Sequence, residues 1–174
     1  AEKSAASGAS CNEGVMLEKV EQEKQQFRSA AFECEAAIKN LIDSGDLLAV
    51  DFPLKHHFAP GLYAREIFIP AGSVIVGKIH KHSHLNCISR GRARVKTEFG
   101  FDILDATESP IVFISEPHTK RVVYAETDTI WTTYHPTVVC DIETDLEKIE
   151  QEVIAKSYEE FEKLSYSDVK GLIQ

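Results

Sequence analysis

The N-terminal part of the chain carries the periodicity of an amphipathic helix. Between about residues 15 and 45, good helix formers predominate, and apolar positions recur at alternating spacings of three and four, which is a heptad pattern. Ser44-Gly45 gives the stop signal. The apolar stripe is narrow, so it suits either the chain's own core or a helix of another subunit. The predicted oligomer contacts are Leu17, Val20, Phe27, Ala31, Ile38 and Leu41.

Residues 46–140 change to short strand-like runs separated by turn signals. The runs occupy residues 47–50, 62–69, 73–80, 85–89, 93–99, 110–114, 121–125 and 129–134. Glycine and proline punctuate them, for example at Pro70-Ala71-Gly72 and Arg90-Gly91. Runs this close together leave no room for crossover helices, so the pattern predicts an all-β sandwich or barrel.

Helical periodicity returns in residues 141–174. Thr144-Asp-Leu-Glu147 has the form of a capping box, and Leu146, Ile149, Val153 and Ile154 form an apolar stripe after it. A second short helix is predicted from Ser157 to Leu164. This C-terminal segment is strongly acidic. The opposite end, residues 1–14, is small and polar and is predicted to be a tail that only a partner would order.

Composition narrows the range of functions. The 174 residues include 19 basic and 28 acidic side chains, so the formal charge is −9, and a nucleic-acid partner is not expected. No apolar run approaches the ~20 residues of a membrane span, and the N-terminus lacks the apolar segment of a signal peptide. The four cysteines include no C-x-x-C pair. We therefore expect a cytoplasmic protein with reduced thiols.

The candidate chemistry is concentrated in one histidine-rich run. His80, His82 and His84 alternate along a predicted strand and share a face with Lys78. Neutral imidazole is the commonest metal ligand, so the run indicates a metal site if the strand curls. Further along, Trp131, Thr133 and His135 share a face that either lines a pocket or fills the core.

The run resembles the first motif of the cupin superfamily, G-x5-H-x-H-x3-E-x6-G. The spacing fits from Gly72 to Gly91 without a gap, but Lys78 stands at the first histidine and His84 at the glutamate. The second cupin motif, P-x-G-x2-H-x3-N, is echoed with His118 at its glycine and Arg121 at its histidine. The resemblance implies a mainly β, cupin-type jelly-roll barrel over residues 46–140, flanked by the N-terminal helix and acidic C-terminal helices.

The altered ligand positions leave three possibilities for the barrel pocket. A typical cupin holds Fe, Mn, Ni or Zn on three histidines and a carboxylate. Two cations at those positions disfavour a divalent ion, because Arg stays protonated and Lys must lose its proton to bind a metal. In the first possibility, His80 and His84 recruit His82, His118, His135 or Glu66 and hold one such ion. In the second, Lys78, Arg121 and the histidine side chains hold a carboxylate or phosphate without metal, in a pocket that also includes Tyr63. In the third there is no ligand.

A second likeness, to small cupin-like proteins encoded by tailed bacteriophages and prophages, concerns provenance. It covers His57-x2-Pro60-Gly61, Tyr63, Arg65-Glu66, His84-Leu-Asn86, Trp131-Thr-Thr and Tyr158-Glu-Glu-Phe161. This likeness constrains fold and provenance more than activity. Together with the heptad seam, the polar tail and the altered ligand set, it favours an accessory or structural role in a phage-related assembly, virion-associated and homo-oligomeric through the helices, over an enzyme. The alternatives are a metal-dependent enzyme acting on a small anionic substrate, and a non-catalytic binder of a carboxylate, phosphate or sugar.

Overall fold

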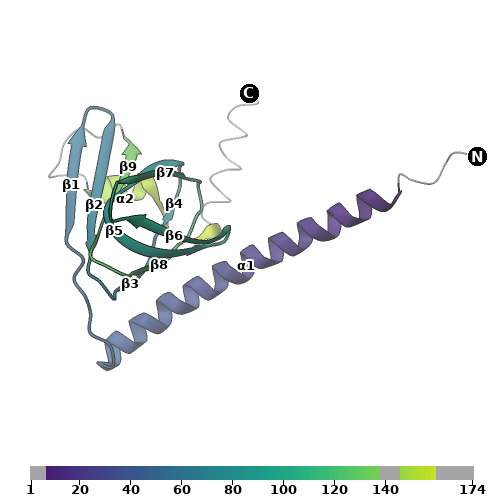
Figure 1. The fold of residues 1–174 in the computed structure, drawn as a ribbon, viewed down its shortest axis with the longest axis horizontal. Coiled ribbons are helices and arrows are strands. Elements are labelled where there is room, and N and C mark those ends of the chain that lie inside the picture. Colours follow the sequence, from purple (N-terminus) through teal and green to yellow (C-terminus); the bar gives the residue numbers. More distant parts are fainter. Residues whose placement is uncertain (1–6, 138–145, 160–174) are drawn as a thin grey trace, which may run out of the picture.

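The strands form a jelly-roll half-barrel, flanked by one long helix and one short one (Figure 1). The computed structural model describes residues 7–137 and 146–159. Its elements are α1 (Ser7–Ser44), β1 (Leu54–Ala59), β2 (Leu62–Ile69), β3 (Val74–Val76), β4 (Ile79–His80), β5 (His84–Thr97), β6 (Gly100–Ala106), β7 (Ile111–Ser115), β8 (Val122–Ala125), β9 (Thr129–Pro136), α2 (Leu146–Val153) and β10 (Ile154–Ala155). The prediction of a mainly β jelly roll with a long N-terminal helix is confirmed.

Strand alternation places the core between the sheets. The main sheet has the order β1-β2-β9-β5-β8-β3, with β6 and β7 also paired to β5, and β10 pairs separately with β4. All these pairs are antiparallel. Inward-facing apolar side chains of β2, β5, β6, β8 and β9 make one cluster that includes Ile69, Ile88, Val95, Val123 and Trp131. The predicted run at residues 62–69 coincides with β2, whereas the run at residues 47–50 is not a strand.

Strand β5 runs through a point where the sequence predicts a turn. Arg90-Gly91 lies inside β5, at a register shift between Ile88 and Arg90 against β9. Gly91 has φ 101°, and a Cβ there would lie 2.4 Å from the Asp128 carbonyl oxygen. The glycine therefore serves a bulge and a close backbone approach, which is the other common use of a glycine within a strand.

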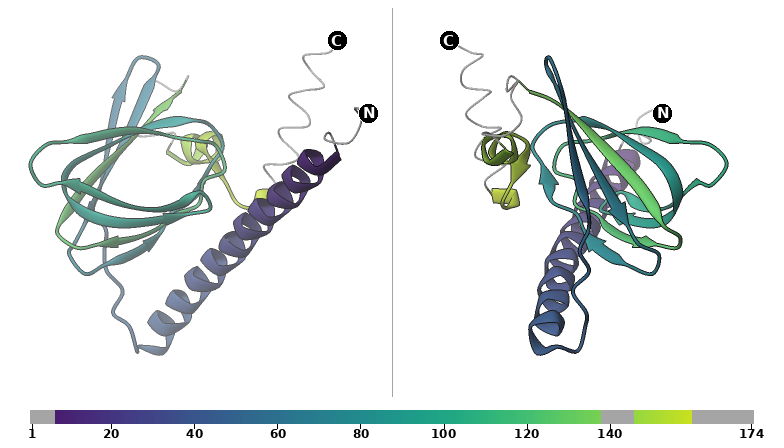
Figure 2. Two further views of the ribbon diagram at one scale, coloured as in Figure 1. Left: turned by 45° about the vertical axis from the view of Figure 1, so that its right-hand side comes forward. Right: turned by 90° about the vertical axis from the view of Figure 1, so that its left-hand side faces the viewer.

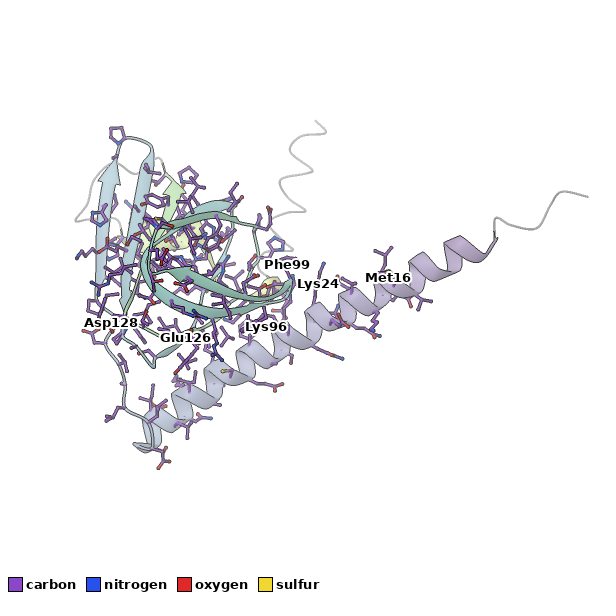
Figure 3. All side chains as sticks on the ribbon, viewed as in Figure 1. Met16, Lys24, Lys96, Phe99, Glu126 and Asp128 are labelled. Carbon is purple, nitrogen blue, oxygen red and sulfur yellow. The ribbon has the colours of Figure 1, made fainter. Side chains whose placement is uncertain are left out.

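Helix α1 begins at Ser7, within the predicted tail, and ends at Ser44, before Gly45. Extending a formed helix adds one hydrogen bond per residue at little cost, which accounts for the earlier start. Residues 1–6 of the predicted tail lie outside the described residues. The helix projects past the barrel, as Figure 3 shows at Met16.

The heptad seam of α1 is used differently along its length. Ala31 is buried, and Phe27, Cys34 and Ile38 are half-buried in the chain's own fold. Lys24 lies over the Phe99 ring, 5.6 Å from its centroid (Figure 3). By contrast, Leu17, Val20 and Leu41 remain 70%, 42% and 45% exposed. The middle of the seam therefore packs on the chain itself, and contact of the exposed positions with another subunit stays a prediction.

The C-terminal helical stripe is shorter than its sequence pattern indicates. Helix α2 covers Leu146–Val153, and Ile154, predicted to continue the stripe, starts strand β10 instead. Ile149 and Val153 are buried against Tyr63. Thr144 of the predicted capping box, and residues 160–164 of the predicted second helix, lie outside the described residues. Among the described helices, none is long and apolar enough to cross a membrane.

Candidate metal centre

Three histidines from three strands meet inside the half-barrel. His80 ends β4, His84 begins β5 and His135 lies near the end of β9. One ligand nitrogen from each lies within 4.8 Å of the others, and the ring centroids are 4.2 to 4.9 Å apart. The residues are 5%, 4% and 2% exposed, respectively. We call this cluster the histidine triad.

Local structure explains how two of these rings come from a single short run. Residues 81–83 form the bend between β4 and β5, so His80 and His84 face each other across the connection instead of standing in line on one strand. The intervening His82 is exposed, but its carbonyl oxygen lies 3.1 Å from His84 Nδ1. Because a carbonyl only accepts, His84 donates its Nδ1 hydrogen, and Nε2 of the neutral ring carries the lone pair.

Burial keeps the triad neutral. Desolvation is the largest cause that lowers the pKa of each ring: to about 4 for His84, to about 3 for His135 and well below 6.5 for His80. The positive charge of Arg65 lowers all three pKa values further, and the hydrogen bond to the His82 carbonyl opposes the shift at His84. Neutral imidazole is the form that binds a metal ion.

The triad also contains buried nitrogen atoms without hydrogen-bond partners. Within the described part of the chain, His80 Nδ1 and His84 Nε2 are enclosed and make no hydrogen bond. Leaving a buried polar atom unsatisfied costs about 1–3 kcal/mol. A transition-metal ion would satisfy both atoms, and three histidines with further positions open are typical of catalytic centres. The residues present therefore fit a divalent transition metal.

Two arginines face this region. Arg121 donates through Nη2 to Ser115 Oγ, which also accepts from Asn86 Nδ2 at 2.6 Å; the Asn86 Oδ1 in turn accepts from Trp131 Nε1 at 2.9 Å. Burial lowers the pKa of Arg121 to about 10, so it stays charged at neutral pH. Arg65 shares the inward face of β2 with Tyr63, and its charge lowers the pKa of each triad ring.

Tyr63 lies beside the triad and connects it to a further histidine. Its ring stacks on His135 at a centroid distance of 6.2 Å, and its hydroxyl lies 2.8 Å from His56 Nδ1. The residue is 3% exposed, and burial raises the pKa of its hydroxyl. Sequence reasoning placed Tyr63 in the pocket wall, but the partnership with His56 depends on the β1–β2 register, which pairs His56 with Arg65.

Two other predicted pocket residues, Lys78 and Glu66, lie away from the triad. Lys78 is exposed and forms an ion pair of 2.9 Å with Glu150. Glu66 faces the other side of β2 and pairs with Lys55 at 2.9 Å. His118 contacts the site through its backbone, whose N–H donates to the His80 carbonyl. Its φ of 67° is a conformation that favours glycine, the residue of the cupin motif at that position.

One cleft of the described structure is separate from the triad. It is a cleft of about 680 Å³ outside the barrel, lined by residues of α1, β4, α2 and β10, with Lys78, Lys120 and Glu150 among them. None of the three triad histidines lines it. The cleft is open and rich in paired charges, so geometry favours the triad as the candidate centre.

Comparisons with known proteins bear on the fold alone. The sequence matches no protein-family model. No curated protein matches it either. Solved structures with cupin folds are similar, at low identity. A cupin domain from Bordetella pertussis is 11% identical with a TM-score of 0.42, over 52% of this chain and 98% of its own. KdgF from Halomonas sp. is 17% identical with a TM-score of 0.41, over 51% and 87%.

A larger enzyme also shows the similarity over part of its length. The salicylate 1,2-dioxygenase of Pseudaminobacter salicylatoxidans is 13% identical with a TM-score of 0.46, and the match covers 74% of this chain but 36% of that enzyme. The class that fold and site define is thus a jelly-roll protein similar to cupins in structure, with a buried three-histidine cluster.

Proposed function

We propose that the half-barrel holds one divalent transition-metal ion on His80, His84 and His135 and acts on a small anionic substrate. The observation that carries this proposal is the pair of enclosed nitrogens, His80 Nδ1 and His84 Nε2, which have no hydrogen-bond partner among the described residues. Imidazole donors suit Zn, Fe and Ni in particular, and Mn is the fourth candidate. Such an ion supplies Lewis-acid or redox chemistry at the positions that the histidines leave open.

The charge around the triad supports an anionic substrate. Within the described residues, no carboxylate or thiol joins the three histidines as a further ligand. A divalent ion there would add two positive charges close to the guanidinium groups of Arg65 and Arg121. For scale, two positive unit charges about 5 Å apart repel each other by roughly 3 kcal/mol at an effective dielectric near 20. A carboxylate or similar anion would neutralise this excess.

The chain's own residues supply binding and orientation. Ser115 fixes the Arg121 guanidinium, whose planar donors match a carboxylate. The His82 carbonyl fixes the His84 ring with Nε2 toward the cluster. Burial of the triad excludes bulk water, which strengthens every charge interaction inside. Tyr63 holds its hydroxyl against His56 Nδ1 at the edge of the site, where a proton can pass between the two groups.

Metal analysis of purified protein tests the proposal. We expect about one Fe, Mn, Ni or Zn ion per chain after preparation without chelator, and loss of the ion in His80→Ala and His135→Ala. His57→Ala is the matched control, because His57 is an exposed histidine on β1. An equal metal content in all four proteins, or none in the wild type after incubation with each ion, would refute the centre. Anion binding without metal would favour the non-catalytic binder.

A second candidate is the accessory or structural role in a phage-related assembly. This role requires contact with other subunits, which the apolar side chains exposed on the projecting part of α1 support, among them Met16 at 71% and Leu17 at 70%. Contact with another subunit would cover them. Light scattering at micromolar concentration tests this role: a defined oligomer that Leu17→Asp dissociates would support it, and a monomer would count against it.

A further inference from the structure

The triad is enclosed, although a metal-dependent enzyme needs an entrance. Its three residues are at most 5% exposed. One segment packs against the residues around the triad: α2 together with β10, residues Leu146–Ala155, which we call the strap. Figure 2 shows α2 outside the sheets, at one side of the barrel. The strap is continuous with the site, because β10 pairs Ile154 with His80, and the Lys81 N–H donates to the Val153 carbonyl.

The strap is attached to the barrel by a short strand ladder. Its strand β10 is joined to β4 by two residue pairs, whereas β2 and β9, which carry Arg65 and His135, share eight. Beyond that, Ile149 and Val153 of the strap pack on Tyr63. The Lys81 side chain donates to the Gln151 carbonyl at 2.6 Å, and the Thr137 hydroxyl donates to Glu152 Oε2 at 3.2 Å. Opening is therefore expected to break this attachment before any long strand ladder.

One side chain of the strap is tied to both sides of the entrance. Glu150 Oε1 lies 2.9 Å from Lys78 Nζ, next to β4, and 3.8 Å from Arg65 Nη1, on the inward face of β2. Arg65 is 20% exposed at its side chain, and the other two are about half exposed. Glu150 thus supplies a negative charge to the arginine that would otherwise attract an incoming anion.

We propose that the strap is a lid over the histidine triad and that the ion pairs of Glu150 keep this lid closed. The inference rests on the proposed function for the identity of what enters. An anion that reaches Arg65 competes with the Glu150 carboxylate, so the Lys78–Glu150–Arg65 bridge is exchanged for contacts to the anion. The two-residue strand, the Lys81 and Thr137 hydrogen bonds and a small apolar contact then hold the strap without the help of an ion pair of Glu150. The same bridge reforms when the anion leaves.

Two charge-removing variants and one control test, in the full chain, whether the ion pairs of Glu150 keep the strap closed. Glu150→Gln removes the bridge from the strap, and Lys78→Met removes it from the barrel. Glu147→Gln takes one charge from the same helix and is the control, because Glu147 has no ion pair among the described contacts. The first readout is hydrogen exchange at the Lys81 amide, whose hydrogen bond to the Val153 carbonyl joins the barrel to the strap. The second is the rate at which excess EDTA removes Co²⁺ from the loaded protein.

We expect both rates to rise about twofold to fivefold in Glu150→Gln and Lys78→Met, as fits a partly exposed ion pair, and to stay unchanged in Glu147→Gln. Unchanged hydrogen exchange in both bridge variants, or an equal rise in the control, overturns the proposal that the ion pairs of Glu150 keep the strap closed. Faster hydrogen exchange with unchanged Co²⁺ release overturns the proposal that the strap is a lid, but does not contradict the proposed metal centre. If no protein binds Co²⁺, the proposed function fails, and the exchange rates still decide whether Glu150 holds the strap.

Discussion

Acid should destabilise the metal-free protein through the triad, and the contribution of His84 can be worked out. Burial lowers the pKa of His84 from 6.5 to about 4. A histidine with a lowered folded-state pKa binds protons more readily when the chain is unfolded. Its contribution to stability is thus complete above pH 6.5 and is lost as the pH falls toward 4. Between pH 7.5 and 5.0, this group alone lowers the free energy of unfolding by about 2 kcal/mol.

Urea denaturation with EDTA at both pH values measures this effect. In His84→Gln, which does not titrate, the loss of stability between pH 7.5 and 5.0 should be smaller than in the wild type by about 2 kcal/mol. His57→Gln, on an exposed histidine, controls for the general effect of acid. If His84→Gln keeps the pH dependence of the wild type, the imidazole is not desolvated as the structure indicates, and the argument for a neutral buried triad fails.

Three further predictions concern the supports of the site. Gly91→Ala should destabilise the fold by about 2 kcal/mol or more in thermal denaturation, since its Cβ would collide with the Asp128 carbonyl; an unchanged melting temperature would refute the close approach. Ser115→Ala should lower the free energy of unfolding by about 1–3 kcal/mol in urea denaturation, because the buried Asn86 amide loses an acceptor. An unchanged free energy would mean that water replaces the serine hydroxyl. Lys120→Met should speed tryptic cleavage of α1, because the buried Lys120 ammonium bonds Glu35 at 2.8 Å; cleavage at the wild-type rate would show that this bond does not hold the helix.

Sequence patterns predicted the strands and the helix that depend on neighbouring residues along the chain. The strand-like run at residues 62–69 coincides with β2, in which every residue after Leu62 is buried or half-buried, on both faces of the strand. The long helix follows from a run of helix formers that Gly45 ends. Arg92 and Arg94 alternate along β5 with the buried Ala93 and Val95, and both pair with Glu126 of the same chain, a partner that no spacing in the sequence reveals.

The candidate site could be predicted only in part. Alternation suggested that His80, His82 and His84 share a face, but the bend at residues 81–83 turns His82 outward. Gly77 likewise separates Lys78 from β3, so the lysine reaches Glu150 and not the interior. His135 joins the triad through the antiparallel pairing of Tyr63 with His135, a non-local register. The available signal was the inward face shared by Trp131, Thr133 and His135, which did not distinguish a ligand from a core residue.

Anomalous diffraction from crystals of the protein loaded with Zn²⁺ tests the central claim most directly. The account predicts one strong peak at the zinc edge, about 2.0–2.1 Å from a nitrogen of each of His80, His84 and His135. A peak that omits any of these histidines, or an ion found only in the outer cleft near Lys78 and Glu150, would contradict it.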